Sequence, residues 1–117
     1  MSRLTLNLVQ GAVSFPFPPS AGEKLQQEIK SLMQSLKESA LQGKMGTKPN
    51  VKPVLEYQYV GDVFFEIFCN PNIYPSPFSA KVLITLRCDR IKLTTEAELT
   101  RLTEDLEQYL LDNNGIM

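Results

Sequence analysis

Residues 55–69 read LEYQYVGDVFFEIFC, and this stretch decides the fold. From residue 55 to 59 apolar residues alternate with polar ones, and from residue 63 to 69 every residue except Glu66 is apolar. Alternation is typical of a strand with one wet face, whereas a run that is apolar on both sides is typical of a strand covered on both faces. Because Gly61-Asp62 separates the two runs, the stretch predicts a β-hairpin whose second strand is buried between two layers.

The register of this hairpin decides which side chains share a face. If the loop has two residues, Tyr59 lies opposite Phe64, and the large side chains of both strands gather on one side of the sheet. The other side, with Val63, Phe65 and Ile67, is then expected to face the core. We expect the first side, together with two nearby bases, to be an interaction face, and its residues are Leu55, Tyr57, Tyr59, Phe64, Phe68, Lys81 and Arg87.

Three kinds of cover would suit such an aromatic face. The N-terminal strands or the proline segment 16–19 could fold back over it. A second copy of the chain could cover it instead, because tyrosine and phenylalanine suit the cores of protein interfaces. Single-stranded RNA is the third alternative, since its bases stack on aromatic rings while Lys81 and Arg87 hold phosphates.

The N-terminal part of the chain predicts a second hairpin and a helix. Residues 4–9 and 12–15 alternate around Gln10-Gly11, which indicates two short strands, with a single longer strand as the alternative. Ser20 and Glu23 have the spacing of a capping box, and an apolar stripe at helical spacing follows. We therefore expect a helix over residues 21–42, with Gly43 as its left-handed stop.

The segment after the central hairpin contains a proline-rich loop, a strand and a second helix. Residues 70–79 include three prolines, which restrict the backbone, so the loop is predicted either to tuck onto the core edge or to form a rigid recognition tip. Residues 80–89 alternate as a third strand, and Thr95 with Glu98 predicts a capping box that opens a helix over residues 96–113. The large apolar residues of the loop are Ile73, Tyr74 and Phe78.

The resulting element order is β(β)-α-β-β-β-α. Apolar residues of the third strand must join Phe65 and Ile67 on the core side, because a slip of one residue would expose all of them. We therefore predict an α+β fold, a two-layer sandwich in which an antiparallel sheet carries both helices on one face. The length of 117 residues suits one domain, residues 1–117, with one core.

Composition narrows the classes of function. The 12 basic and 13 acidic residues leave a net charge of −1, so nucleic-acid binding would need a local patch. The chain has no histidine, which excludes Ser-His and Cys-His nucleophile pairs and histidine metal sites. No cofactor or metal site and no membrane span is expected. Since the N-terminus lacks the apolar block of a secretory signal, a cytoplasmic location is expected.

The two cysteines, Cys69 and Cys88, end apolar runs and are each expected to be buried. Along the predicted ladder they lie on the order of 26 Å apart, whereas a disulfide needs Cα atoms within about 7 Å, so no bond between them is expected. Taken together, the sequence predicts a non-enzymatic interaction protein, such as an adaptor, assembly factor or accessory subunit. It is expected to bind through the aromatic sheet face, as a homodimer or to another protein, with a single-stranded RNA-binding module as the alternative.

Overall fold

The computed structural model of the chain describes residues 2–46 and 50–114, and these form two antiparallel sheets and two helices. Strands β3 to β6 build a four-stranded sheet in the order β3-β4-β5-β6, and β1 and β2 form a separate hairpin. The elements are β1 (Arg3–Asn7), β2 (Ala12–Pro16), α1 (Pro19–Lys44), β3 (Leu55–Tyr59), β4 (Phe64–Cys69), β5 (Lys81–Arg87), β6 (Lys92–Glu98) and α2 (Leu99–Asn114), with short 3-10 turns at η1 (Pro71–Ile73) and η2 (Pro77–Ser79).

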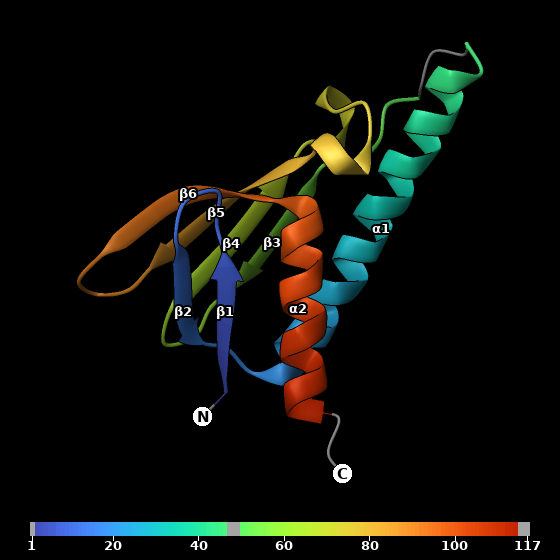
Figure 1. Cartoon of the computed structure of the whole chain (residues 1–117). Helices are drawn as coiled ribbons and strands as arrows, with labels where there is room; N and C mark the ends of the chain where they lie inside the picture. The colour runs from blue at the N-terminus through green and yellow to red at the C-terminus, as the bar shows by residue number, and fades with distance from the viewer. Residues whose placement is uncertain (1, 47–49, 115–117) are drawn as a thin grey trace.

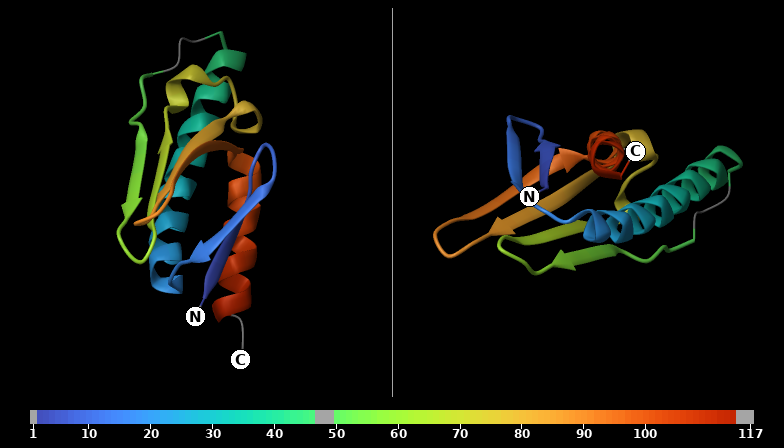
Figure 2. Two further views of the ribbon diagram at one scale, coloured as in Figure 1. Left: turned by 90° about the vertical axis from the view of Figure 1, so that its left-hand side faces the viewer. Right: turned by 90° about the horizontal axis from the view of Figure 1, so that it is seen from below.

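The four-stranded sheet is one layer, and the β1–β2 hairpin, α2 and α1 lie together on one of its faces (Figures 1 and 2). The predicted α+β class, the antiparallel sheet and the placement of both helices on one face are confirmed. The observed order is β-β-α-β-β-β-β-α, so the N-terminal hairpin forms and the sheet contains one strand more than the sequence indicated.

The core lies between the sheet and this covering layer. Across the ladder Tyr59 is paired with Phe65, and Ile67 is paired with Ile84, so these side chains point to the same side. In strands β4 and β5 every second residue is buried, because only one face meets the helices and the hairpin.

Aromatic contacts and polar ties hold the N-terminal hairpin over the sheet. Phe15 and Phe17 both pack edge-on against the Phe65 ring, with centroids 4.8 and 5.4 Å away. The Asp105 carboxylate on α2 accepts hydrogen bonds from the Asn7 backbone N–H and side-chain amide at 2.7 and 2.8 Å. The hairpin is therefore fixed by the core on one side and by α2 on the other.

Helix α1 begins earlier than the sequence indicated, and the predicted capping box is wrong. Pro18 is the N-cap residue, no side chain caps the helix, and Pro19 occupies the first helical position, where a missing N–H costs nothing. At the other end Gly43 lies inside the helix, and the glycine with a left-handed backbone is Gly46, at φ +74°.

The second predicted capping box is also wrong, because Thr95 and Glu98 belong to strand β6. Helix α2 begins only at Leu99. Ala97 is paired with Val82 and points into the core, so extended backbone buries it beside β5. The alternation in this strand is weak, since threonine and glutamate fill most of its positions, and helical signals dominated the prediction.

Candidate interaction surface and pocket

The register of the central hairpin divides the predicted aromatic face between the two sides of the sheet. Tyr59 pairs with Phe65 and not with Phe64, because the connection is longer than two residues. As successive side chains alternate, this one-residue shift moves Leu55, Tyr57 and Tyr59 to the core side. The prediction that these three residues share a face with Phe64 and Phe68 is therefore wrong.

The chain's own N-terminal segment covers the two tyrosines on the core side. The Tyr57 hydroxyl donates to the Ala21 carbonyl at 3.3 Å, and burial raises the pKa of Tyr57 to about 12. The Tyr59 ring lies edge-on to Phe17, with centroids 5.1 Å apart. The fold-back of the proline segment, one of the three covers considered from the sequence, therefore meets Tyr59 through Phe17, whereas helix α1 meets Tyr57 through Ala21.

The other side of the sheet, which we name the open face, carries the remaining predicted residues. Phe68 and Leu83 lie opposite each other on β4 and β5 and expose 39% and 42% of their surfaces. The Arg87 guanidinium lies over the Phe64 ring, 4.8 Å from its centroid. From the pairing, the open face consists of Glu56, Gln58, Phe64, Glu66, Phe68, Lys81, Leu83, Thr85, Arg87, Lys92, Thr94, Glu96 and Glu98.

Charges are unevenly distributed over the open face. Arg87 and Lys92 are paired with each other at one end of the β5–β6 ladder, and Lys81 is paired with Glu98 at the other end. The Glu66 carboxylate accepts a hydrogen bond from the Gln58 amide at 2.7 Å. The face thus combines a small apolar centre with a basic end.

The proline-rich loop contains two 3-10 turns and presents two apolar side chains to solvent. Ile73 and Phe78 expose 67% and 85% of their surfaces, whereas Tyr74 packs against the core. Pro71 and Pro77 are buried and anchor η1 and η2. The loop is therefore partly tucked onto the core edge and partly exposed, and its role as a recognition tip stays a prediction.

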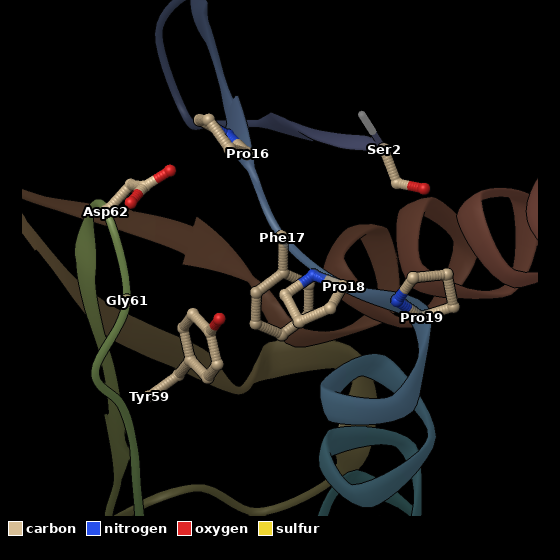
Figure 3. A pocket seen from close by; sticks show the side chains of 8 residues that line it. All are labelled: Ser2, Pro16, Phe17, Pro18, Pro19, Tyr59, Gly61 and Asp62. Carbon is tan, nitrogen blue, oxygen red and sulfur yellow. The ribbon is translucent and has the colours of Figure 1, made fainter.

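A pocket of about 330 Å³ opens where the proline segment meets the β3–β4 loop (Figure 3). The Tyr59 ring packs so closely on Gly61 that a Cβ at Gly61 would lie 2.5 Å from the Tyr59 Cε2 atom. The residues lining the pocket are Ser2, Pro16, Phe17, Pro18, Pro19, Tyr59, Gly61 and Asp62. Sequence reasoning missed this site because the proline run and Gly61-Asp62 are more than 40 positions apart, and the first was considered only as a cover for the aromatic face and the second only as a hairpin turn.

The two cysteines differ in environment. Cys69 is buried, and burial raises the pKa of its thiol to about 11. Cys88 is exposed, which corrects the expectation that both would be buried. Cys69 pairs with Leu55 at one end of the sheet, while Cys88 follows Arg87, the partner of Phe64, at the other end.

Within residues 2–46 and 50–114, neither helix combines the length and hydropathy needed to span a bilayer. The same part of the chain contains no group of three or more His, Cys, Asp and Glu side chains that could hold a metal ion. Comparison of the chain with known proteins found no family model, no curated protein and no solved structure that matches it.

Proposed function

We propose that this chain is a non-enzymatic, cytoplasmic interaction protein that forms a homodimer through its open face. In this role it serves as an adaptor, assembly factor or accessory subunit. The observation that carries the proposal is the exposed pair Phe68–Leu83 on the two central strands, with Phe64 further along β4 on the same face. Aromatic and aliphatic side chains that stay exposed on a flat face lose unfavourable contact with water when a partner covers them.

The distribution of charge favours a second copy as the partner. Arg87 and Lys92 mark the basic end, while Glu56, Glu66, Glu96 and Glu98 outnumber Lys81 over the rest of the open face. In a two-fold dimer whose facing strands run in opposite directions, the basic end of each copy lies toward the acidic part of the other. The same patch therefore supplies both halves of a complementary interface.

The test is the mass of the protein in solution, measured by light scattering over a range of concentrations. We expect the wild-type chain to have twice its monomer mass and Phe68→Glu to be a monomer, because the substitution places a charge in the apolar centre. Val60→Glu is the matched control, since Val60 is an exposed apolar residue in the β3–β4 loop, outside the open face.

Two results would contradict this proposal. A wild-type chain that stays monomeric at every concentration would exclude the homodimer. A dimer that tolerates Phe68→Glu as well as it tolerates Val60→Glu would place the interface elsewhere. Circular dichroism of both variants keeps the comparison valid, because it shows that each retains the fold.

Single-stranded RNA is the alternative occupant of the open face. The Arg87 guanidinium over the Phe64 ring favours it, because bases stack on such groups. The four glutamates of the face against its three bases oppose it, since phosphate binding depends on positive charge. Filter binding of mixed RNA at low salt decides between the two: binding that Phe64→Ala abolishes supports the RNA alternative, and absence of binding removes it.

A further inference from the structure

The pocket beside Tyr59 is poor in hydrogen-bond donors from the backbone. Pro16, Pro18 and Pro19 have no N–H group, and the Phe17 N–H already donates to the Ser2 carbonyl at 3.1 Å. The Ser2 hydroxyl donates to the Asn113 side chain at 2.8 Å. An anion would find few free partners on this side of the pocket, whereas the proline rings offer an apolar wall.

The polar groups that remain favour a positive charge. Asp62 is the charged residue among the eight described residues that line the pocket. In Figure 3 the Tyr59 hydroxyl points toward the space below Asp62 and Pro16, and the Phe17 ring lies beside Tyr59. A carboxylate at the mouth of a pocket that is also lined by a half-buried tyrosine ring attracts organic cations, through its charge and through the electron-rich ring face.

The position of the Tyr59 ring is fixed from two sides. Phe17 contacts it edge-on at 5.1 Å, and the backbone of Gly61 approaches it so closely that no side chain fits between them. A ring held in this way loses little conformational freedom when a ligand binds against it. Gly61, which contacts the ring, directly precedes Asp62 in the chain. The same loop therefore positions both the Tyr59 ring and the carboxylate at the pocket.

We propose that this pocket binds an organic cation, namely an alkylammonium or guanidinium group on an apolar body, between Tyr59 and the Asp62 carboxylate. The volume of about 330 Å³ suits a group of this size. A free amine and a lysine or arginine side chain of a peptide share this chemistry. The site is independent of the homodimer, because Tyr59 lies on the core side of the sheet and the proposed dimer uses the open face.

The test compares probes of the same shape and different charge by ¹⁵N NMR of the intact chain. We expect choline to shift the amide signals of Tyr59, Gly61 and Asp62 in a saturable way. Its neutral isostere, 3,3-dimethyl-1-butanol, is expected to bind at least about tenfold more weakly. N-acetyl-arginine methylamide is the third probe. Tighter binding of the arginine derivative assigns the site to a peptide side chain, and tighter binding of choline assigns it to a free amine.

Two variants connect the binding to the named residues. Asp62→Asn removes the carboxylate and is expected to weaken binding of the cationic probes about tenfold while leaving the neutral isostere unchanged. Asp89→Asn is the control, because Asp89 is an exposed acid in the β5–β6 loop, outside the pocket lining. Equal binding of choline and its isostere, absence of binding by both cations, or full binding in Asp62→Asn would overturn the inference.

Discussion

Gly61 has a structural role that depends on its lack of a side chain. A Cβ there would lie 2.5 and 2.6 Å from the Tyr59 Cε2 and hydroxyl atoms. Because Phe17 supports the ring from the other side, we expect Gly61→Ala to displace Tyr59 and to lower the free energy of unfolding by about 1–2 kcal/mol. Urea denaturation measures this.

Gly43→Ala is the matched control for Gly61→Ala. Gly43 lies within α1 with open space around its Cα, so alanine is expected to stabilise the helix by up to about 1 kcal/mol. Opposite signs for the two alanine variants are the expected outcome. If Gly61→Ala were as stable as wild type, the tight packing of Tyr59 on Gly61 would be refuted.

The two thiols should differ strongly in reactivity. Only the thiolate reacts, and burial both shields Cys69 and raises its pKa to about 11, whereas Cys88 is exposed. With a thiol reagent in mildly alkaline buffer we expect one fast equivalent, which Cys88→Ser removes, and a second equivalent that appears only on unfolding. Two fast equivalents in the native protein would contradict the burial of Cys69.

Tyr57 should make the fold sensitive to alkali. Its pKa rises from 10.0 to about 12 in the folded chain, chiefly through burial, so the folded state keeps a proton that the unfolded state has lost. The resulting stability is complete below about pH 10 and is lost as the pH rises through 12. Urea midpoints measured across this range should fall less steeply for Tyr57→Phe than for wild type.

At the scale of elements, Phe17 is one of the two aromatic residues that anchor the N-terminal hairpin on the sheet. Phe17 exposes 1% of its surface and contacts the rings of Phe15, Tyr59 and Phe65. We expect Phe17→Ala to cost about 3–5 kcal/mol in unfolding free energy, because it leaves a cavity between hairpin and sheet. Phe78→Ala removes an equally large but exposed ring and should change the stability by less than about 0.5 kcal/mol. Similar losses in both variants would contradict the anchoring role of Phe17.

Elements with strong local signals were predicted well. Strand β5 and helix α1 have apolar periodicities that match their exposure to one side of the core. Strand β4 is apolar on both sides, and the prediction that it is covered on both faces is wrong, because its second face, with Phe68, stays exposed. Strand β6 was missed, because Thr95 and Glu98 imitate a capping box and the strand has little apolar alternation of its own. Pairing with β5 outweighs that local preference, as hydrogen bonds along the ladder and burial of Ala97 stabilise extended backbone there.

At the scale of the whole molecule, protection of backbone amides from hydrogen exchange should be greatest in the middle of the four-stranded sheet. Strands β4 and β5 each have a hydrogen-bonded neighbour on both sides, whereas β3 and β6 are at the edges. We therefore expect the slowest hydrogen exchange at the amides of Phe65, Ile67 and Ile84, which also lie in the core. Exchange in β6 that is as slow as in β5 would show that a further element or a second chain protects that edge.

The sequence by itself determined the class of fold. The spacing of apolar residues determines which helices and strands have an apolar side to bury, and therefore which of them pack together. It also determined the restricted backbone of the proline-rich loop, since proline fixes φ wherever it occurs. Tertiary structure alone decided the register of the central hairpin and with it the side on which Tyr57 and Tyr59 lie. The physical reason is that a shift of one residue exchanges the two faces of a strand, and the choice depended on the fit of Phe15 and Phe17, distant in the chain, against Phe65 and Tyr59.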